Sequence, residues 1–257
     1  MDIAKAFSLA GKTAIVTGAA KTTGLCYGMA TALRDAGAKV ALLDVSDGIF
    51  PLAESLGGAA NGYYAVKADL CDQPSREAGF AKAVEALGGR LDILLNGAGL
   101  QHRCDAIDFP ADKWNIIINV NLSAMFYMCQ LAARVMREQK EGGKIINIAS
   151  MTSFMGSKRI PAYTASKGGV MQLTKALSNE WCGLGINVNA IAPGYMDTEL
   201  TANMIHTEQG KAHTARIPAG RWGKSEDLQG AVVFLASPAS DYVSGAILPV
   251  DGGYLGM

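Results

Sequence analysis

Several residue types and patterns are scarce in this sequence of 257 residues, and each scarcity argues against a class of protein. The five cysteines are an odd number without a Cys-x-x-Cys pair, which indicates free thiols in a reducing compartment rather than a disulfide framework. The three histidines form no cluster with ligand spacing, so we expect no metal site. No uninterrupted apolar run has the length of a membrane span.

Net charge is also absent, because 23 Lys and Arg residues balance 23 Asp and Glu residues. A chain without net charge has no general attraction for nucleic acid or for an anionic membrane, so we expect neither partner. The first twenty residues contain Lys5 and Lys12 and lead straight into a strand pattern, which is not the layout of a signal peptide. We therefore predict a cytoplasmic protein that acts on a small molecule.

What the sequence does contain is an alternation of short β-branched runs with longer helical patterns, without internal repeats. Strands are predicted at 13–17, 40–44, 63–67, 93–96, 144–149, 187–191 and 246–250. Helices are predicted at 25–36, 75–87, 113–139 (as one helix or two), 163–181 and 225–235. This order predicts an α/β fold in which one domain, residues 1–257, contains a Rossmann-type doubly wound parallel sheet of about seven strands. Ligands bind such sheets beyond the carboxyl ends of the strands.

The clearest chemical signal is Tyr163 with Lys167, in the segment PAYTASKGG. Their four-residue spacing places both side chains on one face of a helix. A tyrosine hydroxyl, with a reference pKa of about 10, is a poor acid or base at neutral pH, and we expect the neighbouring ammonium to lower that pKa. Ser150 ends the fifth strand and can hold a substrate oxygen near the phenol. Asn121 could fix a water molecule that passes protons to Lys167.

The first βαβ unit carries an altered glycine loop, TGAAKTTGLC. Counting back from Gly37 along the helix pattern puts Cys26 at the third glycine position of a dinucleotide fold and Gly24 at the second, after two extra residues. An ungapped count instead makes Gly24 the third glycine and Thr22 the replaced second. The spacing of the helix pattern makes us favour the first register. Gly24 then still lets the backbone approach a pyrophosphate, and Thr22 and Thr23 add hydroxyl donors near the helix N-terminus.

The choice of cofactor depends on two side chains of opposite charge. Asp44 closes the second strand, where an acid accepts hydrogen bonds from the adenosine ribose and repels a 2′-phosphate. Lys21 in the glycine loop favours the opposite choice, because a basic side chain there can help to bind that phosphate. A carboxylate at the ribose should outweigh one exposed lysine, so we predict NAD, with NADP as the alternative.

With these residues in place, the chain resembles the classical short-chain dehydrogenase/reductase family over nearly its whole length. The matching segments are TAIVTG, DILLNGAG, NVNL, IINIAS, YTASK, NVNAIAPGYMDT and VDGG. The resemblance implies hydride transfer between a nicotinamide and a carbinol or carbonyl carbon. Tyr163 would be the acid/base, Lys167 its partner and a ribose ligand, Ser150 the carbonyl orienter and Asn121 the anchor of a proton relay. It also implies a homotetramer that assembles through helices 113–139 and 163–181.

The strand ends and the family motifs together predict the cofactor site. Its residues are Gly18, Thr22, Thr23, Gly24, Leu25, Asp44, Asp69, Leu70, Asn96, Ala98, Gly99, Tyr163, Lys167, Pro193, Gly194 and Thr198. By resemblance, Asp69 accepts from the adenine amine and Thr198 faces the nicotinamide carboxamide. One residue departs from the family pattern Asn-Asn-Ala-Gly, since this chain has Gly97 in the second place, and we expect a local packing effect from it.

Substrate choice should lie in the variable segments after the strands, including a long polar stretch around 195–221 that we interpret as a mobile lid. Cations in these segments suit a substrate with a carboxylate. The predicted substrate contacts are Arg103, Ser150, Thr152, Arg159 and Tyr195. The lid also carries Arg216 and Arg221, for which a structural role is the stronger alternative.

The same segments narrow the resemblance to the bacterial 2-deoxy-D-gluconate 3-dehydrogenases, also known as 2-dehydro-3-deoxy-D-gluconate 5-dehydrogenases, with gluconate 5-dehydrogenases as near relatives. The motifs are "GGKIINIASM.SF.G..R.P.YTASK" and "RIPAGRWG". This resemblance implies a sugar acid as substrate. Two alternatives remain: a reductase of another carbonyl (a polyol, a cyclic ketone or a 3-oxoacyl thioester) and a scaffold protein that has lost the cofactor.

Overall fold

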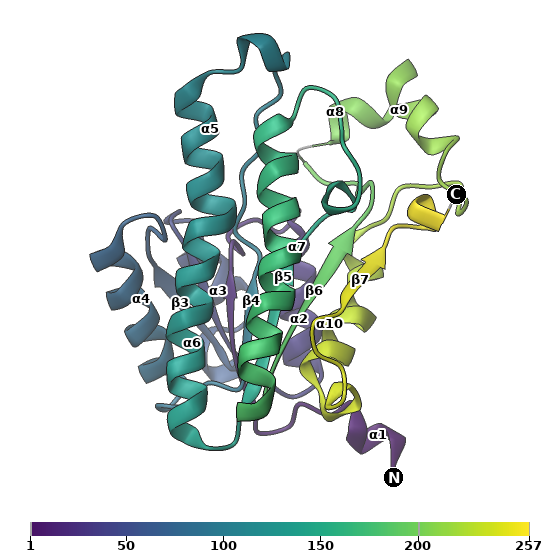
Figure 1. The fold of residues 1–257 in the computed structure, drawn as a ribbon. Coiled ribbons are helices and arrows are strands. Elements are labelled where there is room, and N and C mark those ends of the chain that lie inside the picture. The colour runs from purple at the N-terminus through teal and green to yellow at the C-terminus, as the bar shows by residue number, and fades with distance from the viewer. Residues whose placement is uncertain (1, 200, 257) are drawn as a thin grey trace.

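In the computed structural model, which describes residues 2–199 and 201–256, seven strands form one parallel sheet in the order β3-β2-β1-β4-β5-β6-β7 (Figure 1). The strands are β1 (Thr13–Thr17), β2 (Lys39–Asp44), β3 (Tyr63–Lys67), β4 (Ile93–Asn96), β5 (Gly143–Ile148), β6 (Ile186–Pro193) and β7 (Ile247–Val250). The strand order reverses between β1 and β4, which is the switch point where such sheets bind ligands. The predicted doubly wound α/β fold is confirmed.

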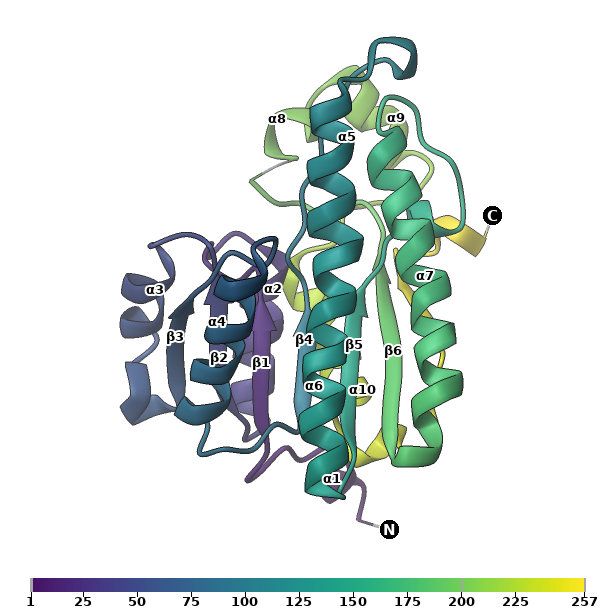
Figure 2. The same ribbon diagram turned by 60° about the vertical axis from the view of Figure 1, so that its left-hand side comes forward.

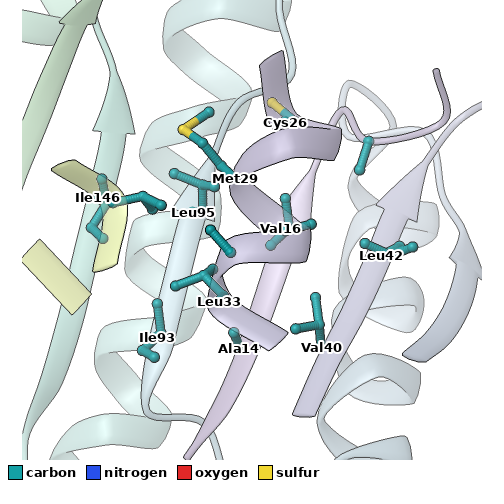
Figure 3. Packing of buried hydrophobic residues seen from close by; sticks show 14 of the residues in the cluster. Ala14, Val16, Cys26, Met29, Leu33, Val40, Leu42, Ile93, Leu95 and Ile146 are labelled. Atoms are coloured by element: carbon teal, nitrogen blue, oxygen red, sulfur yellow. The ribbon is translucent and has the colours of Figure 1, made fainter. Parts of the chain in front are cut away.

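Helices cover both faces of this sheet, as Figure 2 shows. The helices are α1 (Ile3–Ala6), α2 (Leu25–Asp35), α3 (Ile49–Ser55), α4 (Gln73–Ala86), α5 (Ala111–Ile118), α6 (Met125–Gln139), α7 (Pro161–Trp181), α8 (Ala202–Ile205), α9 (Glu208–Thr214) and α10 (Gln229–Ala236). Successive strand residues point to opposite faces, so Val16 packs in the layer with α2 and α10, and Ile15 in the layer with α4, α6 and α7. Figure 3 shows Met29 and Leu33 of α2 against β1 and β4.

The predicted segment 113–139 is one helical run that includes a π-helical turn, Asn119–Ala124, between α5 and α6. By length and composition alone this run could cross a membrane, since its most apolar window has a mean hydropathy of 1.5. In the fold, α6 buries Met128, Cys129 and Met136 against the sheet. These apolar side chains therefore belong to the core of the domain.

Four short helices, α1, α3, α8 and α9, were not expected from the sequence. α3 is stabilised by packing, because Ile49 and Leu52 are buried although the helix has only seven residues and contains a proline. α8 and α9 lie in the polar stretch interpreted as a lid, where Thr207 caps α9 by accepting from the backbone N–H of Gly210 at 3.1 Å. Figures 1 and 2 show both helices beyond the carboxyl ends of the strands.

A buried polar network attaches α7 to the middle of the sheet. Asn96 Nδ2 of β4 donates to Asn147 Oδ1 of β5 at 3.0 Å, and Asn147 Nδ2 donates to Thr174 Oγ1 of α7, also at 3.0 Å. Networks of this kind hold elements in one arrangement, because an unpaired polar group in the core is costly. The network therefore helps to fix the position of α7 over the sheet.

Candidate active site

Tyr163, Lys167 and Ser150 meet beyond the carboxyl end of β5. Tyr163 and Lys167 lie one turn apart on α7, and the Lys167 ammonium is 5.6 Å from the centre of the Tyr163 ring. Ser150 follows β5, and its hydroxyl accepts from the backbone N–H of Thr152 at 3.1 Å and shares a hydrogen bond with the Tyr163 phenol. The three predicted catalytic side chains are therefore brought together by two adjacent elements.

The acidity of these groups differs from the expectation. Burial raises the pKa of Tyr163, and the hydrogen bond with Ser150 opposes this rise without reversing it. Burial lowers the pKa of Lys167 to about 8. The prediction that Lys167 lowers the pKa of Tyr163 is therefore wrong for this structure, where the loss of water around the phenol dominates and Lys167 Nζ donates to the Ile148 carbonyl at 2.6 Å.

Asn121 lies in the π-helical turn, a distortion that is frequent at functional sites. Its side chain accepts from the backbone N–H of Leu100 at 2.7 Å and donates to the Leu100 carbonyl at 2.9 Å and to Ser166 Oγ at 3.1 Å. A Cβ placed on Gly99 would lie 3.5 Å from Asn121 Oδ1 and 3.9 Å from Lys167 Nζ. Asn121 thus ties the segment after β4 to the catalytic helix, and its role in a proton relay stays a prediction.

The glycine loop has the features that a pyrophosphate needs. Gly24 is the N-cap of α2 and, having no side chain, leaves the first backbone N–H groups of that helix uncapped, whereas Asp72 caps α4 by accepting from the Ser75 N–H. Uncapped N–H groups at a helix start bind anions well. Gly18 adopts φ +74°, and a Cβ there would lie 2.7 Å from Ala98 Cα. The loop therefore fits a dinucleotide, with Leu25 at the start of the helix.

The two departures from the family pattern lie against each other. A Cβ placed on Gly97 would overlap the Cys26 sulfur and lie 3.0 Å from the Thr17 carbonyl oxygen. Figure 3 shows Cys26 at the start of α2, beside the ends of the strands. Cys26 thus lies against the segment after β4, near the end of β1, where a close helix–strand approach is needed, which favours the register that puts it at the third glycine position. The Cys26 side chain therefore occupies the space that a side chain at position 97 would need.

The two residues that bear on cofactor choice are both engaged. Asp44 accepts from the backbone N–H of Ala20 at 3.1 Å and of Ser46 at 3.0 Å, so it joins the end of β2 to the glycine loop. Lys21 Nζ lies 3.1 Å from Glu199 Oε2, which also accepts from Thr23 Oγ1 at 3.3 Å. Sequence reasoning missed Glu199, because nothing in the sequence around it indicates a partner in the glycine loop.

The other predicted cofactor residues lie at the same edge of the sheet. Asp69 is exposed after β3 with Leu70 buried beside it, and Pro193 ends β6. A Cβ on Gly194 would lie 2.7 Å from Asp251 Cα, and the Thr198 N–H donates to Thr201 Oγ1 at 3.0 Å. Asn96 differs from the others, because its amide takes part in the core network described above and only its backbone faces this edge.

Three of the predicted substrate contacts, Thr152, Arg159 and Tyr195, have different surroundings in the structure. Thr152 is 4% exposed, and its hydroxyl has no hydrogen-bond partner in the part of the chain that the structure describes, which points to a ligand beside Ser150. Arg159 forms an ion pair with Asp105 at 3.0 Å, so its charge already has an acidic partner. Tyr195 belongs to an aromatic group with Trp222, at 5.0 Å between ring centres.

Known proteins resemble this chain throughout. The family model described as enoyl-(acyl carrier protein) reductase matches residues 18–255. The 2-dehydro-3-deoxy-D-gluconate 5-dehydrogenase of Dickeya dadantii is 45% identical over 98% of this chain and 99% of its own.

Two solved structures are also similar. A candidate 2-deoxy-D-gluconate 3-dehydrogenase of Agrobacterium tumefaciens with bound NADP is 43% identical, covers 98% of this chain and 99% of its own, and has a TM-score of 0.86. A gluconate 5-dehydrogenase of Burkholderia cenocepacia in complex with NADP and tartrate is 35% identical over 99% of both chains, with a TM-score of 0.93. With its seven-stranded parallel sheet and these similarities over nearly its whole length, this chain belongs to the short-chain dehydrogenase/reductase family and is an NAD(P)-dependent oxidoreductase.

Proposed function

We propose that the protein transfers a hydride between NAD and a secondary hydroxyl or ketone of a sugar acid of the 2-deoxygluconate or keto-deoxygluconate type. The observation that carries this proposal is the meeting of Tyr163, Lys167 and Ser150 beside a group of cations and aromatic rings around Tyr195. The names of the similar proteins support a sugar acid, and tartrate, held by one of them, is itself a dicarboxylate.

Each catalytic side chain has a role that follows from its position. Ser150 holds the substrate oxygen by a hydrogen bond, and the Tyr163 phenol exchanges a proton with that oxygen. Lys167 is placed to contact a ribose hydroxyl and to share the proton path, with Asn121 fixing the neighbouring segment. The chemistry supplied by bound NAD is the acceptance or return of a hydride at C4 of the nicotinamide.

The choice of NAD over NADP rests on Asp44 and on the ion pair of Lys21. Asp44 stands at the end of β2 where the adenosine ribose is bound in such folds. Lys21 is directed to Glu199 and is thereby drawn away from a 2′-phosphate. Two solved relatives contain bound NADP, so members of this group also bind the phosphorylated cofactor. The proposed preference for NAD therefore rests on Asp44 and Lys21 of this chain alone.

Replacing Asp44 with Ala is expected to shift the ratio of kcat/KM for NAD to kcat/KM for NADP toward NADP by about tenfold or more, since a charged hydrogen bond contributes about 1.5–3 kcal/mol. The measurement is steady-state kinetics with each cofactor at a fixed, saturating substrate concentration. Asp47→Ala is the matched control, because Asp47 is exposed in the same turn and pairs with Lys67. An unchanged ratio in Asp44→Ala would remove Asp44 from the cofactor site.

A panel of substrates tests the proposed reaction. We expect NADH absorbance to appear with 2-deoxygluconate, gluconate or keto-deoxy sugar acids, and to be at least about 100-fold slower with polyols and cyclic ketones of similar size, because only the acids satisfy the cations. An assay of a 3-oxoacyl thioester with NADPH tests the alternative that the protein is a reductase of another carbonyl. Activity confined to compounds without a carboxylate contradicts the sugar acid, and failure to bind any nicotinamide cofactor would establish the scaffold alternative.

We further propose that residues 195–221 act as a lid on this site and that the protein is a cytoplasmic homotetramer without nucleic-acid or membrane partners. α8 and α9 lie over the carboxyl ends of the strands, which supports the lid (Figure 2). The long helices α6 and α7 supply faces of the kind through which such sheets assemble, and Tyr127 of α6 is 42% exposed. Sedimentation of the purified protein measures its assembly directly.

A further inference from the structure

The start of the lid and its second helix form a compact group of rings and cations. The Tyr195 ring stacks on His213 at 4.5 Å between centres and meets the Tyr254 ring edge-on at 5.3 Å. The Arg216 guanidinium lies over the Tyr254 ring, with Cζ 4.9 Å from its centre. Arg103, from the segment after β4, is close enough for its charge to act on both Tyr195 and His213.

This group lies next to the catalytic side chains. Tyr195 comes directly after the Pro193–Gly194 corner at the end of β6. Tyr195, Tyr254 and Trp222 share one apolar cluster with Met151, which adjoins Ser150 in the chain. A ligand held at Ser150 therefore has this group beside it.

The cations of the group lack the acidic partners that neighbouring cations have. Arg221, five residues further along, is paired with Asp227 through two nitrogens at 2.7 and 2.8 Å, and Lys211 of α9 is paired with Glu208 at 2.7 Å. Arg103 and Arg216 form no ion pair with any residue in the ranges 2–199 and 201–256. Two arginines beside one histidine repel one another, and burial together with these charges lowers the pKa of His213.

We propose that Arg103, Arg216 and His213 form the binding site for the carboxylate of the substrate. This inference rests on the proposed sugar-acid function and adds His213 and Arg216 to the predicted contact Arg103. A carboxylate would satisfy two guanidinium groups and relieve their repulsion, and guanidinium is suited to two-point binding of carboxylates. Because two of the three side chains belong to the lid, binding of the acid also holds the lid over the site.

The test compares Arg103→Gln, Arg216→Gln and His213→Gln with the wild type on a sugar acid and on the amide of the same acid. We expect each arginine variant to raise KM for the acid by about 10- to 100-fold, with a smaller rise for His213→Gln. The KM for NAD and the melting temperature should stay within the wild-type range. With the amide, the wild type and the variants should have equally high KM values, because the amide lacks the negative charge that the two arginines bind.

Two controls make the result specific. Lys211→Gln removes a cation of the same lid helix that already has an acidic partner, and it should leave the KM for the acid unchanged. Arg216→Lys keeps the charge without the planar fork and should fall between wild type and Arg216→Gln. If the wild type turns over the acid and all three Gln variants keep KM within twofold, this inference is overturned while the proposed function stands. If the wild type uses only neutral carbonyl compounds, both are overturned.

Discussion

Tyr163→Phe is expected to lower kcat by about 10²- to 10⁴-fold, the range that general acid–base catalysis contributes, while the affinity for NAD stays within about twofold. The substitution removes only the phenolic oxygen, which bonds to Ser150, and leaves the ring beside Lys167 in place. Turnover is measured from NADH absorbance, and cofactor affinity from quenching of protein fluorescence.

Tyr242→Phe is the matched control, because Tyr242 is fully exposed and far along the chain from the site, and its kcat should equal that of the wild type. Ser150→Ala should lower kcat by a smaller factor, since it orients the oxygen but does not exchange the proton. Near-full turnover in Tyr163→Phe would show that another group serves as the acid and base.

The second large effect is expected from Gly97→Asn, which restores the residue typical of the family at that position. Its Cβ would overlap the Cys26 sulfur, so α2 or the segment after β4 must move. Overpacking a core contact of this kind costs about 1–3 kcal/mol in the free energy of unfolding. Because the contact lies under the glycine loop, KM for NAD should rise as well.

The double variant Cys26→Gly with Gly97→Asn should recover most of both losses, because the glycine frees the space that the asparagine needs. Cys26→Gly alone should destabilise the protein by about 1 kcal/mol, through the small cavity and the glycine in the first turn of α2. Urea unfolding and NAD titration of the wild type, the two single variants and the double variant give the coupling free energy between positions 26 and 97. A double variant no more stable than Gly97→Asn alone would mean that the two departures are independent.

Local patterns in the sequence were enough to predict the main elements and the catalytic pair. The strands at 13–17, 63–67 and 93–96 agree with the structure in both bounds, because a buried parallel strand is a short apolar run between turn residues. Tyr163 and Lys167 could be placed on one helix face because a four-residue spacing is a property of the helix itself. Helix ends and the short helices were less predictable. Packing stabilises α3, whereas α8 and α9 have only four and seven residues and almost no buried side chains, too little for a periodic pattern to show.

The contacts between distant segments could not be predicted in this way. Cys26 and Gly97 were both visible as departures, but only the approach of α2 to the end of β4 shows that one fills the space left by the other. Lys21 meets Glu199 across 178 residues of chain, and no pattern in either segment refers to the other.

The sequence by itself determined the fold, the family motifs and the candidate catalytic residues, because periodicity and strand-end position are local properties. The tertiary structure decided how those residues behave. Burial sets the acidity of Tyr163 and Lys167, since desolvation depends on everything packed around a group. The fold brings His213 and Arg216 near Arg103 because the ends of parallel strands share one edge of the sheet, which gathers there segments that are far apart in the chain.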